Sequence, residues 1–248
     1  MCRMRMGKII LCGLVLLLLV CVIPAAAYSV ESNADNGDKP TMIVEYGKGK
    51  DAGLVKVTHI HYAKSADKAR PSKTSTCFKL LGSTWANDIQ YSVQESISPE
   101  LTSSIRASAS TWDDATGETL FSGTFPLTSG KIWGQHDAVN LITYGDYSQD
   151  GVIAVTVTWY IPGRTKWAVE SDILFDTDFT WGNADKDSTL MDLQNIATHE
   201  IGHTLGLSDL YTDACSTVTM YGYSTEGDTT KQTLEIPDIT GLSKLYGA

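Results

Sequence analysis

The most informative segment of this 248-residue chain reads His199-Glu200-Ile201-Gly202-His203-Thr204-Leu205-Gly206-Leu207-Ser208-Asp209. Residues four apart are neighbours on one face of a helix, so His199 and His203 can bind the same ion. Glu200 follows His199 directly, which places its carboxylate to act on a water at that ion rather than to bind the ion. Gly206 accepts the left-handed backbone that ends a helix, and the chain can then bring Asp209 back as a third ligand. The segment predicts a Zn²⁺ site with one open coordination position.

A solvated helix face is the alternative interpretation of the pentapeptide His-Glu-x-x-His, which also occurs by chance. The full pattern through Asp209 is far more restrictive, and it contains two of only five histidines in the chain. The candidate site residues are therefore Glu200 as the catalytic group and His199, His203 and Asp209 as metal ligands.

These eleven residues resemble the zinc-binding motif of the metzincin peptidases, H-E-x-x-H-x-x-G-x-x-H/D. The stretch Thr217-Val218-Thr219-Met220-Tyr221 resembles their methionine-containing turn, and residues 234–247 resemble the closing helix of the matrixin-like members. The resemblance implies an α+β fold: a twisted, mostly parallel sheet with an antiparallel edge strand, two long helices and a C-terminal helix. It further implies that residues 155–160 form the edge strand along the cleft, where an extended peptide adds as another strand.

The resemblance also implies a secreted zinc metalloendopeptidase, in which a zinc-activated water attacks a peptide bond and Glu200 serves as general base. Two other functions stay open: a zinc amidase acting on a non-peptide amide, and a secreted zinc-stabilised binding protein without turnover. The presence of Glu200 argues against the binding protein, because a purely structural metal site needs no base.

The chain departs from the matrixin pattern in three respects. Asp209 stands where matrixins have a third histidine, and Arg70-Pro71 with Cys77 does not reproduce their P-R-C-G latency motif. Because no histidine lies between His136 and His199, we expect the second, structural zinc of matrixins to be missing. Calcium is a further expectation at Phe175-Asp176-Thr177-Asp178, with a merely solvated acidic loop as the equal alternative.

Residues 1–27 have the pattern of a secretory signal peptide. Arg3, Arg5 and Lys8 precede an uncharged apolar run over residues 9–23, and Pro24-Ala25-Ala26-Ala27 offers a small-residue cleavage site. An uncleaved membrane anchor is the alternative, but the run is shorter than the ~20 residues that a spanning helix needs. We therefore expect a secreted protein that meets the membrane only through this segment before its cleavage.

The domain boundary is expected near Cys77. Residues 28–76 form a polar pro-segment or flexible N-terminal extension with two short strand-like pieces, and residues 77–248 form the zinc-dependent catalytic domain. Cys77 and Cys215 remain after signal removal, and a disulfide between them would stabilise the fold by about 4–5 kcal/mol in the entropic description. The rival interpretation is that the Cys77 thiolate caps the zinc of a latent precursor.

The net negative charge of the chain restricts the classes of molecule that it can bind. Without its signal the chain has 16 of its 19 Lys and Arg residues against all 29 Asp and Glu residues. Such an acidic protein is a poor candidate for nucleic acid or an anionic membrane, so the expected partner is a peptide or protein substrate.

Periodicity predicts helices and strands in alternation after residue 77. Ser98 and Pro99 open a helix that ends at Gly117, Thr189 begins a second helix in a capping-box-like pattern, and a last helix covers residues 237–246. Strands are expected over residues 41–46, 54–62, 89–93, 119–123, 138–144, 152–160 and 167–175. His59 and His61 share one strand face; metal binding is one interpretation and an ordinary polar strand is the favoured one.

Overall fold

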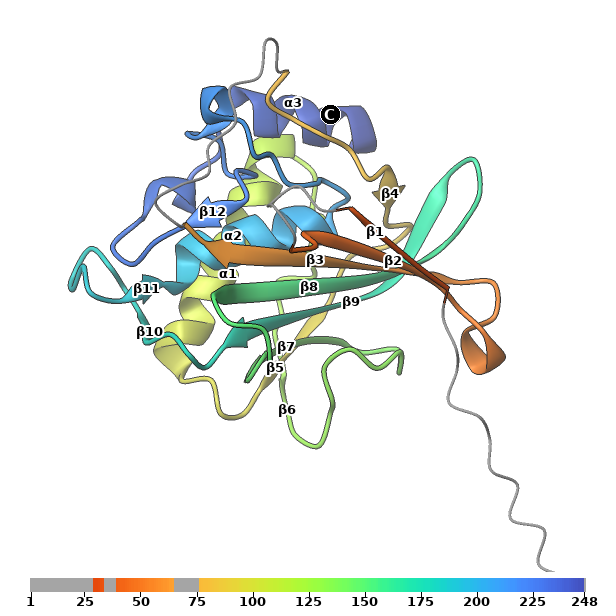
Figure 1. The fold of residues 1–248 in the computed structure, drawn as a ribbon, viewed down its shortest axis with the longest axis horizontal. Coiled ribbons are helices and arrows are strands. Elements are labelled where there is room, and N and C mark those ends of the chain that lie inside the picture. Colours follow the sequence, from red (N-terminus) through yellow and green to blue (C-terminus); the bar gives the residue numbers. More distant parts are fainter. Residues whose placement is uncertain (1–28, 34–38, 65–75, 248) are drawn as a thin grey trace, which may run out of the picture.

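The computed structural model describes residues 29–33, 39–64 and 76–247, with side chains for the latter two ranges (Figure 1). The expected signal segment lies outside the described residues. Among those described, no helix is both long and apolar enough to cross a membrane. The elements are β1 Ser29–Asn33, β2 Met42–Tyr46, η1 Gly49–Asp51, β3 Val55–Ala63, β4 Ser83–Thr84, β5 Tyr91–Gln94, α1 Pro99–Thr116, β6 Leu127–Thr128, β7 Asn140–Gly145, β8 Val152–Ile161, β9 Lys166–Asp176, β10 Trp181–Gly182, β11 Met191–Asp192, α2 Leu193–Thr204, η2 Asp213–Cys215, β12 Tyr223–Ser224, η3 Thr230–Gln232 and α3 Ile236–Tyr246.

One large twisted sheet carries the fold, with strand order β1-β2-β3-β8-β9-β7-β5-β6. Strands β6, β5, β7 and β9 run parallel to one another, and β8 runs antiparallel to β9. The N-terminal strands β1 to β3 then extend the sheet in antiparallel fashion beyond β8. The expected α+β architecture is confirmed: within residues 77–247 the sheet is mostly parallel, with antiparallel β8 as its last strand.

Helices α1 and α2 pack together against one face of this sheet (Figure 1). Local signals define α1: the Ser98 side chain accepts a hydrogen bond from the backbone of Leu101, and Gly117 ends the helix in the left-handed conformation. Trp112 on α1 is fully buried, and its indole nitrogen donates to the Thr198 carbonyl of α2 at 2.9 Å. This contact holds the two helices in register and so sets the position of the motif on α2.

Three expectations on secondary structure were wrong in detail. Helix α2 starts at Leu193, because Asp192 rather than Thr189 caps it by accepting from the Asn195 backbone at 2.7 Å. Residues 119–123 make a single bridge, between Phe121 and Ile89, instead of a strand.

The third correction concerns the sheet edge. Strand β8 is not exposed at the edge of the sheet, because β3 pairs with it over residues 55–62. The alternating sequence of β8 gives it a polar face, with Thr156 and Thr158, but that face is buried. Pairing with a segment so distant in the chain leaves no local signal in β8 itself.

The Cys77–Cys215 disulfide is present, with the two Cα atoms 5.3 Å apart. It ties residue 77 to the loop between Asp209 and Met220. The rival role of Cys77 as a metal-capping thiolate is incompatible with this bond.

Replacing both cysteines by serine is expected to lower the free energy of unfolding by about 2–5 kcal/mol, the usual cost of losing a native disulfide in a small domain. Urea denaturation of the variant and of the parent protein, with and without reductant, measures the difference. Reductant should have no effect on the variant. An equal midpoint and slope for both proteins would show that the bond does not stabilise the fold.

Candidate metal centre

The three predicted ligands meet at one point. Helix α2 presents the Nε2 atoms of His199 and His203, which lie 3.1 Å apart. Gly206 has a φ of +95° and turns the chain out of the helix; a Cβ there would lie 2.1 Å from the Ser83 carbonyl oxygen. The turn brings Oδ1 of Asp209 to 3.1 Å from His199 Nε2 and 3.3 Å from His203 Nε2. The structure thus assembles all three residues that the motif predicted.

This triangle is close to the dimensions of a zinc site, with one edge of 3.3 Å and two slightly shorter edges of 3.1 Å. Ligand atoms about 2.0–2.2 Å from a tetrahedral zinc lie roughly 3.3–3.6 Å from one another. The Nδ1 atoms of His199 and His203 donate to the carbonyls of Thr219 at 2.7 Å and Leu207 at 3.0 Å, so both Nε2 atoms face the centre with lone pairs. Oδ1 of Asp209 is buried and accepts no hydrogen bond from the described residues. Three electron-rich atoms converging in a buried space need a cation between them, and this donor set fits zinc.

The pKa shifts of His199 and Asp209 agree with metal binding, whereas without a metal the Asp209 carboxylate raises the pKa of His203 despite its burial. Burial lowers the pKa of His199 to about 3, so this imidazole is neutral, as a ligand must be. Burial alone would raise the pKa of Asp209, but the charge of His203 and the close approach of the His199 and His59 imidazoles hold it well below its usual range. Asp209 is therefore anionic, and a cation held beside it would carry a lower net charge than one held by three neutral imidazoles.

Glu200 lies beside the ligands and is completely buried. One carboxylate oxygen accepts a hydrogen bond from the Thr156 hydroxyl of β8. Burial raises the pKa of Glu200 to about 7, and the nearby Asp209 carboxylate adds to this rise. A carboxylate with such a pKa is suited to accept and return a proton near neutral pH.

The methionine-containing turn supports the centre from below. Met220 is buried, and a Cβ on Gly202 of α2 would lie 2.3 Å from its sulfur, so the helix and the turn are in close contact. The carboxylate of Asp238, near the start of α3, accepts from the backbone of Thr219 at 2.9 Å and of Met220 at 3.3 Å. Asp238 therefore fixes the turn whose Thr219 carbonyl orients His199.

Two histidines of β3 contact the predicted ligands. The His59 ring stacks on His203 with centroids 4.0 Å apart, and the His61 ring lies 4.1 Å from His199. Both are buried. These residues do lie on a strand, as the favoured interpretation expected, but that strand face is buried against the predicted ligands, so four of the five histidines of the chain gather at this centre.

The sequence reasoning also missed Thr156, Lys231 and Asp238, all of which are buried at or near the centre. Lys231 donates to the Tyr221 carbonyl and lies 3.4 Å from Nε2 of His61. Burial lowers the pKa of Lys231 to about 8. Only the His-x-His spacing of β3 offered a usable signal, since the other three residues come from separate elements.

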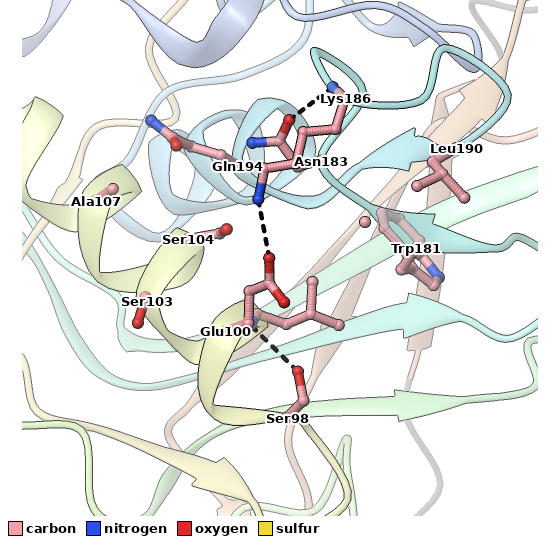
Figure 2. A pocket seen from close by; sticks show the side chains of 12 residues that line it. Ser98, Glu100, Ser103, Ser104, Ala107, Trp181, Asn183, Lys186, Leu190 and Gln194 are labelled. Atoms are coloured by element: carbon pink, nitrogen blue, oxygen red, sulfur yellow. Dashed lines mark hydrogen bonds and ion pairs between the residues drawn. The ribbon is translucent and has the colours of Figure 1, made fainter.

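Little free space adjoins the metal centre. The void beside Asp209 and His59 measures about 10 Å³, which is close to the size of one water. A pocket of about 590 Å³ lies elsewhere, between α1 and the β10–β11 region (Figure 2). It is open and polar, and Lys186 crosses its mouth to Glu100 at 3.2 Å, with no candidate site residue in its lining. The larger pocket is therefore not the candidate active site.

The two aspartates expected to bind calcium, Asp176 and Asp178, come together with a third carboxylate. Asp176 and Asp178 lie beside Asp146 from the loop after β7, and one oxygen from each falls within 4.8 Å of the others. Asp150, which belongs to the same loop as Asp146, is not part of this group. Asp176 is buried and accepts from the backbone of Asp178 at 2.9 Å.

Comparison with known proteins places these features in context. The sequence model of the family described as Peptidase_M10: Matrixin matches residues 86–247. Among curated proteins, matrix metalloproteinase-18 of Xenopus laevis is 31% identical over 135 residues, which cover 52% of this chain and 27% of that protein. Stromelysin-1 of Mus musculus is 30% identical over 151 residues, covering 58% and 28%. Metalloendoproteinase 4-MMP of Arabidopsis thaliana is 30% identical over 98 residues, covering 40% and 27%. The similarity thus spans roughly a quarter of each relative's length.

Proposed function

The chain belongs to the matrixin family, and on that premise we propose that it is a zinc-dependent endopeptidase that hydrolyses peptide bonds in protein substrates. The observation that carries the proposal is the buried triangle of His199, His203 and Asp209, with edges of 3.1–3.3 Å and the Glu200 carboxylate beside it. A structural site would have four protein ligands and would not need a neighbouring base.

Each residue has a distinct role in the proposed reaction. Zinc, when bound, polarises the scissile carbonyl and makes the attacking water more acidic. His199, His203 and Asp209 hold the metal, and the Thr219 and Leu207 carbonyls orient the two imidazoles. Glu200 accepts the proton of the attacking water at one carboxylate oxygen and then returns it to the leaving amine. Thr156 donates to the other carboxylate oxygen and so orients Glu200 for this transfer.

Further parts of the proposal concern processing and the second cation. We propose that residues 1–27 direct secretion and that residues 28–76 are a pro-segment ahead of a catalytic domain that begins at Cys77. Calcium at Asp146, Asp176 and Asp178 is proposed as a structural cation, supported by the convergence of their oxygens. A calcium-dependent rise in melting temperature that Asp178→Asn removes is the test of that site.

Cleavage of casein by the purified protein tests the main proposal. The activity should be abolished by a chelator and restored by zinc. A zinc amidase would instead spare every denatured protein but hydrolyse small amides, and a zinc-stabilised binding protein would bind zinc and cleave neither. The buried Glu200 beside the ligands favours the two enzymes over the binding protein.

A further inference from the structure

Strand β3 lies directly across the metal centre. It pairs antiparallel with β8 along residues 55–62. At its C-terminal end, Tyr62 and Ala63 pair in parallel with β12. Figure 1 shows β3 in this position, as the strand next to β8 and below β12. Within the described part of residues 77–247, β8 therefore borders the position of β3 along its length and β12 borders it only at Tyr62 and Ala63, and an extended peptide would enter this slot by adding to the β8 edge.

The side chains of β3 alternate so that His59 and His61 face α2. His61 approaches the proposed base: its Nδ1 lies 3.2 Å from Oε1 of Glu200. Lys231 can only donate, so its contact with His61 Nε2 places the imidazole proton on Nδ1, which then donates to Glu200. With Thr156 bonded to the other oxygen, both oxygens of the Glu200 carboxylate are engaged.

His59 lies at the metal ligands themselves. It is 1% exposed, and neither of its ring nitrogens has a hydrogen-bond partner among the described residues. Oδ2 of Asp209 is 3.6 Å from His59 Nδ1, beyond hydrogen-bonding distance. One ligand atom each of His59, His203 and Asp209 lies within 4.8 Å of the others. A buried imidazole without a partner is costly, and a shared metal ion would satisfy it.

We propose that residues 39–64 are a built-in inhibitor of the peptidase, in which β3 occupies the substrate slot, His61 holds Glu200, and the His59 ring, turned out of its stack on His203, supplies the fourth ligand to the catalytic zinc. This inference rests on the proposed function and extends it to regulation. A fourth protein ligand converts an open catalytic site into a closed one. Imidazoles on a strand thus take the place of a cysteine, which residues 28–76 do not contain.

Activation then requires that β3 leaves the sheet. The strand is continuous with the catalytic domain only through residues 65–75, and the Cys77–Cys215 bond does not include it. A single cut in that connection removes the tether, so the segment can dissociate on dilution.

Zinc affinity of the full chain tests the ligand role of His59. We expect His59→Ala to weaken zinc binding by about 10–100-fold, at least the loss that follows removal of a supporting group around a metal. It should also alter the visible absorption of the cobalt-substituted protein. His136→Ala removes the one histidine outside the centre together with its 2.9 Å bond to Asp51 of the same segment, so it controls for loosening of the segment, and it should leave the cobalt spectrum that of the parent protein. Equal affinity and an identical cobalt spectrum for His59→Ala and the parent protein would overturn the ligand assignment. His59→Gln provides the same test if the alanine variant does not fold.

Peptidase activity tests the inhibitory role separately. The full chain receives a recognition sequence for a specific protease between Lys64 and Thr76 and is assayed on casein before and after cutting and dilution. We expect the intact chain to be at least about tenfold less active than the cut one. A tenfold difference corresponds to a free-energy preference of about 1.4 kcal/mol for the state in which β3 occupies the slot. His59→Ala and His61→Ala should raise the activity of the intact chain and leave that of the cut chain unchanged. Equal activity before and after cutting would overturn the inhibitor. No activity in either state would instead count against the endopeptidase, while the cobalt spectrum would still decide the role of His59.

Discussion

Glu200→Gln is expected to lower casein cleavage by roughly 10²–10⁴-fold, the usual contribution of a positioned acid–base group, while zinc stays bound. The substituted amide keeps the size of the side chain and can still accept a hydrogen bond from Thr156, but it cannot take a proton from the attacking water. Because the change leaves His199, His203 and Asp209 untouched, metal content should remain at the parent level. The rates are best measured on the cut chain, where β3 no longer covers the residue.

The exposed Glu118 offers a matched control, since Glu118→Gln removes the same charge far from the centre. Its rate should equal that of the parent protein. A Glu200→Gln protein with full activity would show that another group performs the proton transfer. The pH profile provides a second check: activity should fall as the pH drops through the pKa of Glu200, because the protonated carboxyl cannot act as a base.

Asp209→Ala is the second change with a large expected effect, a loss of zinc affinity of about 100-fold or more. Removing one of three ligands costs more than the 10–100-fold typical of groups that only support ligands. At a fixed zinc concentration the stabilisation of the folded protein by the metal falls accordingly, by about 2.7 kcal/mol for each 100-fold in affinity when zinc is in excess. Competition with a coloured chelator measures the affinity, and thermal unfolding with and without zinc measures the stabilisation.

Two further variants complete this experiment. Asp213→Ala removes an exposed carboxylate from the same loop and should leave zinc affinity unchanged. Asp209→His should retain the metal and move the acidic limb of the pH profile to lower pH. The reason is that the Asp209 carboxylate raises the pKa of Glu200, and a neutral imidazole in its place makes the centre more positive. An unchanged profile, or undiminished zinc binding by Asp209→Ala, would exclude residue 209 as a ligand.

Local patterns predicted those parts of the fold whose causes are local. The cap at Ser98, the proline after it and Gly117 predicted α1, because each acts on backbone groups within a few residues. The start of α2 was placed too early for the opposite reason: Met191-Asp192 pairs with Trp181-Gly182 as a short strand, and this pairing displaces the capping pattern at Thr189.

Several groups at the centre depend on contacts between distant segments. Asp238 holds the methionine-containing turn from the beginning of α3, and Thr156 reaches Glu200 from β8. Each is a common residue in an unremarkable local pattern, so nothing near it in the sequence indicates its role. The resemblance to metzincins predicted the turn itself but not the carboxylate that supports it.

The amino-acid sequence alone predicted that His199, His203 and Asp209 meet at one point with Glu200 beside them, as the structure shows. A helical turn and one glycine bring these four side chains together within eleven residues. The spacing of the residues is therefore enough to predict how the side chains are arranged. Only the tertiary structure decided that β3 covers them. Backbone hydrogen bonds between β3 and β8 have no side-chain signature, and alternation shows that His59 and His61 share a face without showing what that face meets.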